Sequence, residues 1–237
     1  MTVERQLIVN ADDFGQSSGV NQGIIEAYER GIVTSASLMV RWPSALEAAA
    51  YSRVNPDLSL GLHLDLGEWA FSNETWIPLY EVAAVDDIVG VAEEVSRQLT
   101  AFRRLVGKYP THIDSHQHVH LREPVRSVAI GTAQKLAVPL RDCSPEVNYC
   151  GNFYGQTDEG LSLPGRISAL GLIRIIAALP PGLTELSCHP SVANDLDTMY
   201  GSERVEELKV LCDPQVRAAV ANMGIELRSF IDRGTPI

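Results

Sequence analysis

Short apolar runs alternate with longer amphipathic stretches from one end of the 237-residue chain to the other. Each short run is rich in Leu, Ile or Val, which is typical of strands that are buried on both faces of a parallel sheet. The predicted strands are Gln6–Asn10, Ser35–Val40, Leu58–Leu62, Thr111–Asp114, Val138–Arg141, Thr184–Ser187 and Ile225–Leu227.

The stretches between these runs carry apolar residues at helical spacing. The longest places Ile88, Val95 and Leu99 on one face, and two others begin just after a proline. A capping aspartate followed by proline, Asp213-Pro214, opens another. The predicted helices are Gly19–Arg30, Asp86–Val106, Val125–Leu136, Ile167–Leu179 and a segment from Asp213 to about Met223.

Strands and helices thus alternate in about seven units, which predicts a parallel sheet, either closed as a barrel or open and doubly wound. No proline- or serine-rich linker, internal repeat or low-complexity run divides the chain. We therefore expect a single α/β domain over residues 1–237.

Two aromatic-rich stretches, Asp65–Val85 and Ser144–Leu163, do not follow this alternation. Both come after predicted strand ends, so both are expected to overhang the edge of the sheet where parallel α/β folds bind ligands. Their aromatic side chains have two interpretations. They stack on sugar faces, or they form a hydrophobic lid that packs on itself or on the second subunit of a homodimer.

Composition restricts the class of partner. With 45% hydrophobic residues the chain can bury a sizeable core. A net charge of −11 and a pI of about 5.0 argue against a nucleic-acid-binding or anionic-membrane surface. The N-terminal Met1-Thr2-Val3-Glu4-Arg5 leads into the first strand without a signal-peptide core, and no apolar window suits a membrane span. Four scattered cysteines suit reduced thiols, so we expect a soluble, cytoplasmic protein.

Two adjacent carboxylates, Asp12 and Asp13, end the first predicted strand. Neighbouring side chains point in different directions along an extended backbone, so one can ligate a cation while the other faces substrate or water. The alternative is a turn or a helix N-cap, because Ser17 and Gly19 indicate that a helix starts soon afterwards. The position at a strand's carboxyl end favours a functional role.

Histidines stand near the ends of three later strands, at His63, in the segment from His112 to His120, and at His189. A single histidine in an apolar strand is more often a hydrogen-bonded core residue than a ligand. The His112–His120 segment has His or Asp at every second position, so an extended chain would place all of them on one face. We expect one or two of them to bind a cation and the others to support the ligands or the substrate.

Carboxylates and imidazoles gathered at one edge are typical of a divalent-metal site with a spare acid and base. The chain contains no GxSxG elbow, Walker loop or GxGxxG, so serine-hydrolase, P-loop and dinucleotide-binding functions have no support. Cys188 and His189 are adjacent on a strand and point apart, which argues against a Cys–His nucleophile. The residues predict a metal-dependent hydrolase.

Several motifs resemble those of the YdjC-like carbohydrate deacetylases, the family that includes chitooligosaccharide deacetylase. They are LIVNADDFG at Leu7–Gly15, GIIEAYERGIVTSASLMV at Gly23–Val40, GLHLDL at Gly61–Leu66, THIDSHQHVH at Thr111–His120 and SCHP at Ser187–Pro190. The likeness runs in order along nearly the whole chain. It implies a distorted TIM-like (β/α) barrel that removes acetyl groups from N-acetylated sugars with a divalent cation.

The resemblance also implies roles for single residues. Asp13, His63 and His116 match the family's metal ligands, for Mg²⁺ or Zn²⁺. Asp12 resembles the general base, and His189 resembles the acid. The residues expected to bind substrate or support the ligands are Asp114, His118, His120, Arg141 and Tyr154. Two alternatives remain open: an amidohydrolase-like metal-dependent barrel hydrolase, and a catalytically silent sugar-binding protein on the same scaffold.

Overall fold

A parallel sheet with the N-terminal strand at its centre forms the core of the protein. The computed structural model describes residues 4–232, so the first residues of the N-terminal segment discussed above lie outside it. The parallel strands are β1 (Arg5–Phe14), β2 (Ser35–Leu38), β3 (Ser59–Leu64), β6 (Ile113–Ser115), β7 (Asn148–Cys150), β8 (Gly182–Cys188) and β9 (Ile225–Leu227). Their order is β6-β3-β2-β1-β8-β7, and β9 pairs with β1.

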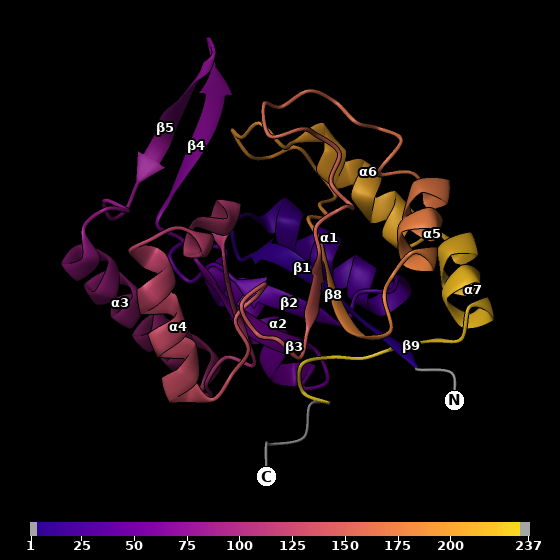
Figure 1. Ribbon diagram of the computed structural model, residues 1–237, viewed down its shortest axis with the longest axis horizontal. Coiled ribbons are helices and arrows are strands. Elements are labelled where there is room, and N and C mark those ends of the chain that lie inside the picture. The colour runs from indigo at the N-terminus through magenta and orange to yellow at the C-terminus, as the bar shows by residue number, and fades with distance from the viewer. Residues whose placement is uncertain (1–3, 233–237) are drawn as a thin grey trace.

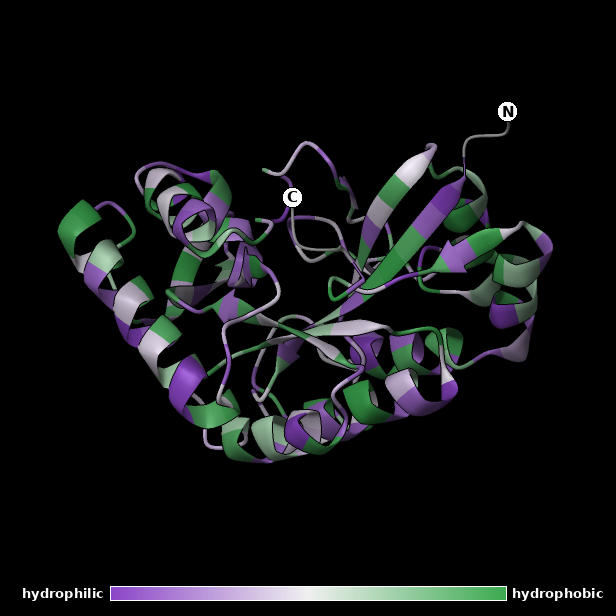
Figure 2. Ribbon diagram, turned by 90° about the horizontal axis from the view of Figure 1, so that it is seen from below, coloured by the Kyte–Doolittle hydropathy of each residue, from purple (hydrophilic) through white to green (hydrophobic). Residues whose placement is uncertain are grey.

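Helices cover the outer side of this curled sheet as an arc (Figure 2). They are α1 (Ser18–Arg30), α2 (Ala45–Val54), α3 (Ile88–Val106), α4 (Val125–Leu136), α5 (Ala169–Ala177), α6 (Ser202–Leu211) and α7 (Pro214–Asn222). The seven-stranded parallel sheet is open between β6 and β7, so the molecule is a half-barrel. The predicted distorted (β/α) barrel with about seven parallel strands is confirmed. No helix among residues 4–232 is both long and apolar enough to cross a membrane.

Strand β1 is buried on both faces, which explains its apolar run Leu7-Ile8-Val9. Leu7, Ile8, Val9 and Ala11 are all fully buried, and the strand pairs in parallel with β2 on one side and β8 on the other. Because every pairing in this sheet is parallel, the carboxyl ends of the strands lie at one edge. The polar residues that follow those ends are therefore brought together.

Helix α1 begins after Ser17, the residue that caps it. The side chain of Ser17 accepts a hydrogen bond from the backbone N–H of Val20, and the helix ends before Gly31. At Gly23 a Cβ atom would lie 2.4 Å from the Cα of Ser191, so only glycine allows α1 to approach the segment after β8 this closely.

Two predictions about extended segments are wrong. Val138–Arg141 forms only a single parallel bridge, between Ile113 and Leu140, because Pro139 offers no N–H to a ladder and Asp142 turns the chain with φ 52°. The extended chain predicted through His120 ends with β6, and the next residues form a short 3₁₀ helix, η1 (His116–Leu121).

An antiparallel hairpin, β4 (Gly67–Ser72) and β5 (Thr75–Glu81), accounts for the first aromatic-rich stretch. It projects from the body of the molecule above the edge where the parallel strands end (Figure 1). Trp76, Ile77 and Leu79 of β5 remain exposed.

The sequence analysis did not predict strand β7 or helices α2 and α6.

Candidate functional site

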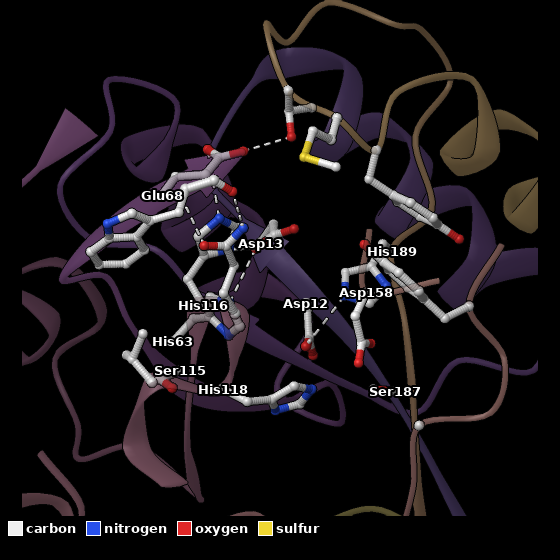
Figure 3. Close-up of a pocket in the computed structure, with 18 of the residues that line it drawn as sticks. Asp12, Asp13, His63, Glu68, Ser115, His116, His118, Asp158, Ser187 and His189 are labelled. Atoms are coloured by element: carbon white, nitrogen blue, oxygen red, sulfur yellow. Dashed lines mark hydrogen bonds and ion pairs between the residues drawn. The ribbon is translucent and has the colours of Figure 1, made fainter. Parts of the chain in front are cut away.

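A cleft of about 910 Å³ lies at the carboxyl ends of the parallel strands. Asp12, Asp13, His63, His116 and His189 all contribute to its wall. Figure 3 shows the two imidazoles of His63 and His116 beside Asp13, with His189 on the other side of Asp12. The structure thus brings together residues from β1, β3, η1 and the segment after β8.

The carboxylate of Asp13 is the centre of this cluster. A shift of register between Ala11 and Phe14 and a left-handed backbone at Asp13, φ 67°, turn its side chain into the cleft. Its Oδ1 lies 3.1 Å from Nε2 of His63 and 3.0 Å from Nδ1 of His116. Its Oδ2 accepts a hydrogen bond from Arg204 at 2.7 Å. One carboxylate oxygen therefore stays directed at both imidazoles.

The ring of His63 is held so that one nitrogen is available. Nδ1 donates to Asp114 at 2.8 Å, since an ionised carboxylate can only accept. Nε2 is buried, has no hydrogen-bond partner among the described residues, and faces Asp13. A carboxylate behind a histidine is the arrangement that orients metal-ligating imidazoles in proteins.

Electrostatics at this point favour positive charge. Burial alone would lower the pKa of His116, but the carboxylates of Asp13 and Glu68 outweigh it and raise the pKa to about 9. Burial alone would also lower the pKa of His63, but the carboxylates of Asp114 and Asp13 outweigh it and raise the pKa well above its usual value. The field that stabilises an imidazolium here would also stabilise a bound cation.

Among residues 4–232, two groups of side chains have the spacing to hold a metal ion: Asp13 with His63 and His116, and Asp12 with His63 and Asp114. In the second group, both oxygens of Asp12 already accept from Arg141, at 2.6 and 2.7 Å, and Asp114 also contacts that guanidinium. A cation there would be repelled by Arg141. In the first group the guanidinium of Arg204 contacts only Oδ2 of Asp13, while Oδ1 and the two imidazole nitrogens face one another, so this group fits a divalent cation better.

Arg141 holds Asp12 in place from below the cleft. Its side chain is fully buried and contacts three carboxylates, those of Asp12, Asp114 and Glu185. Burial alone would raise the pKa of Asp12, but Arg141 outweighs this and the pKa is lowered, so Asp12 is ionised at neutral pH. Burial raises the pKa of Glu185 to about 7 despite the same guanidinium.

His189 faces Asp12 across the cleft. Its Nε2 lies 3.7 Å from Oδ2 of Asp12, its Nδ1 lies 3.8 Å from Oε1 of Glu207, and its side chain is 19% exposed. The backbone N–H of His189 and the hydroxyl of Tyr200 also donate to Glu207. The ring of Tyr154 packs edge-on against His189 at 5.5 Å and stacks on Tyr200.

The alternate residues of the His112–His120 segment do not share one face. Ser115 Oγ accepts from the backbone N–H of His120 and contacts its ring at 2.6 Å, which closes the turn, and Gln117 and His118 adopt left-handed backbones. Nε2 of His118 contacts the Tyr149 hydroxyl at 3.1 Å beside the cleft. His120 is fully buried, and its Nε2 contacts the carbonyl of Arg141.

His112 lies away from the cluster and stacks on Phe230 at 3.9 Å. Asp114 and Arg141 act on the cleft through His63 and Asp12 and are not part of its wall. Tyr154 does line the cleft.

Three charged residues near the candidate ligands were not predicted from the sequence. Arg204 and Glu207 are buried on α6, and Glu68 lies on the hairpin. On α6, the charged residues Arg204 and Glu207 occupy buried positions, where a helix normally carries apolar residues. This hides the apolar spacing from which a helix is predicted.

A parallel half-barrel with carboxylates and imidazoles at the carboxyl ends of its strands defines an α/β protein whose ligand site lies at that edge. The chain belongs to the YdjC-like family, because the family model described as YdjC-like protein matches residues 6–222. It is 35% identical to a chitooligosaccharide deacetylase of Serratia marcescens, over 97% of this chain and 100% of the relative. It is also 35% identical to a carbohydrate deacetylase of Geobacillus stearothermophilus, over 95% and 97% of the two chains.

Solved structures show the same fold. A proposed cellobiose-phosphate cleavage protein of Enterococcus faecalis V583 superposes with a TM-score of 0.74 at 27% identity, over 97% of this chain and 98% of that one. A family 4 carbohydrate esterase of Streptomyces lividans, in complex with acetate, superposes with a TM-score of 0.56 over 95% and 93%. At 11% identity this second likeness supports the architecture alone.

Proposed function

We propose that this chain is a divalent-metal-dependent hydrolase that removes acetyl groups from N-acetylated sugars. The observation that carries the proposal is the convergence of Asp13 Oδ1, His63 Nε2 and His116 Nδ1 beside an ionised Asp12 that faces His189. The names of the two curated relatives, a chitooligosaccharide deacetylase and a carbohydrate deacetylase, support the substrate class.

Asp13, His63 and His116 would hold the cation. A divalent cation bound there would polarise the acetamide carbonyl and lower the pKa of water, with Mg²⁺ and Zn²⁺ both compatible with a mixed oxygen and nitrogen set. Arg204, on the far oxygen of Asp13, fixes the direction in which that carboxylate points.

Asp12 acts as the general base. It accepts the proton of the attacking water while Arg141 holds both of its oxygens in position. Its lowered pKa makes it a weak base, so the reaction depends on a water that is already acidified. This is the chemistry that the neighbouring cation would supply.

His189 acts as the general acid toward the leaving amine. It stands on the opposite side of Asp12 from the metal ligands, so an acetamide between them would present its carbonyl to one side and its nitrogen to the other. Glu207 lies behind Nδ1, with its Oε1 3.8 Å away. The products would be acetate and a free amino sugar.

Aromatic side chains around the cleft suit a sugar substrate. Trp69 and Trp76 of the hairpin, with Tyr149, Tyr154 and Tyr200 from the other side, line the same cavity. Flat apolar surfaces of this kind pack against the faces of sugar rings, and the polar groups between them can bind hydroxyls.

Metal stoichiometry tests the ligand set directly. The wild-type protein, dialysed against Zn²⁺ and passed through a desalting column, should retain one ion per chain by elemental analysis. His116→Ala should lose that ion and remain folded, because a ligand to the cation is removed. His118→Ala is the matched control from the same turn and should keep it. Full occupancy in His116→Ala would contradict the assignment.

A further inference from the structure

The two imidazoles of the candidate metal site are arranged alike. Each directs one ring nitrogen at Oδ1 of Asp13, through Nε2 in His63 and Nδ1 in His116. Each directs its other nitrogen at a second carboxylate. For His63 this is Asp114 at 2.8 Å, and for His116 it is Glu68, whose Oε2 lies 3.6 Å from Nε2.

Glu68 is built into this position. It is only 5% exposed, although it belongs to a hairpin whose second strand is largely exposed. Its Oε1 accepts from the hydroxyl of Thr198 at 2.6 Å, which leaves Oε2 directed toward His116 (Figure 3). The next residue, Trp69, is fixed by two backbone hydrogen bonds with the Gln117 side chain: its N–H donates to Oε1 at 2.9 Å, and its carbonyl accepts from Nε2 at 2.7 Å. The hairpin is thus tied to the same turn that carries His116.

Nε2 of His116 is the ring nitrogen that faces Glu68. That atom is buried and has no hydrogen-bond partner among the described residues, so Glu68 is the carboxylate placed to accept a hydrogen bond from its N–H. Side-chain movement of less than an ångström would turn the 3.6 Å ion-pair distance into a hydrogen bond of about 2.8 Å. With the proton on Nε2, the lone pair of Nδ1 faces Asp13 and the cation.

We propose that Glu68 is a positioning residue for the metal site, and that it holds His116 with a proton on Nε2 so that Nδ1 ligates the cation. This inference rests on the proposed metal site and adds to it a residue outside the parallel sheet. It means that His63 and His116 ligate through different nitrogens, and that the hairpin β4–β5 contributes to cation affinity.

Zinc titration of the apo-protein in the absence of substrate tests the proposal. Glu68→Gln should weaken Zn²⁺ binding by about 10- to 100-fold, the range seen when the carboxylate behind a ligating histidine is removed. Asp114→Asn should weaken it similarly through His63. Glu81→Gln is the matched control, because Glu81 lines the cleft from the same hairpin but contacts no imidazole in the described structure. Equal affinity of Glu68→Gln and wild type would overturn the inference.

A spectroscopic readout separates positioning from a general effect on folding. In the Zn²⁺-loaded wild type, long-range ¹H–¹⁵N spectra should show His116 protonated at Nε2 and His63 protonated at Nδ1. In Glu68→Gln the His116 pattern should change while that of His63 stays the same. A wild-type His116 that ligates through Nε2 would overturn the role of Glu68. A wild-type protein that binds no cation would instead overturn the proposed metal-dependent function.

Discussion

Asp12→Asn is expected to lower kcat by about 10²- to 10⁴-fold while one divalent cation stays bound. Asparagine keeps the shape of the side chain and can still accept from Arg141, but it cannot take a proton from water. The two functions of the Asp-Asp pair are therefore separable, because Asp12 contacts Arg141 and Asp13 contacts the imidazoles. Acetate release and metal content should be measured on the same preparation.

Asp158→Asn is the matched control for that substitution. Asp158 also lines the cleft, but it belongs to neither the ligand set nor the Asp12–Arg141 pair. We expect it to retain near-wild-type kcat. Loss of metal from Asp12→Asn in proportion to its loss of activity would mean that the roles of the two aspartates are exchanged.

Arg141→Met is expected to destabilise the protein by about 3–5 kcal/mol at neutral pH. The substitution removes the only guanidinium that contacts Asp12, Asp114 and Glu185 in the described structure, and it leaves these buried carboxylates without that positive charge. Without the guanidinium, burial is expected to raise the pKa of Asp12 above that of the unfolded chain. The folded state would hold protons that the unfolded chain releases, so the loss of stability should grow as the pH rises.

Urea unfolding at pH 5 and pH 8 measures both parts of this expectation. Arg97→Met is the control, because Arg97 pairs with Glu93 and Glu94 on the surface with 60% of its side chain exposed. Its cost should be small, because water screens an exposed ion pair. A similarly small cost for Arg141→Met would show that the buried charge network does not stabilise the fold.

Much of this site was predictable because parallel strands place their carboxyl ends together. Asp12, Asp13 and His63 follow directly from the ends of short apolar runs, and such runs identify strands buried on both faces. His116 was found for the same reason, although the turn that orients it was not. That turn depends on Ser115 bonding to a residue five positions later, which no alternation of polar residues indicates.

The missing part of the site depends on contacts between distant segments. Arg204 reaches Asp13 across 191 positions, and Arg141 reaches Asp12 across 129. A buried charge is stabilised only by its partner in the folded state, so its own sequence neighbourhood resembles that of a surface residue. For that reason the helix carrying Arg204 and Glu207 was missed, as was the hairpin that supplies Glu68.

Acetate release from N-acetylated chitooligosaccharides tests the central claim most directly. Protein stripped of metal with a chelator should release no acetate, and addition of one equivalent of a divalent cation should restore release together with a free amine on the sugar. A parallel reaction with His116→Ala should stay inactive at the same cation concentration. Undiminished acetate release by the stripped wild-type protein would contradict a metal-dependent deacetylase. So would the absence of release from every N-acetylated sugar by the fully loaded protein.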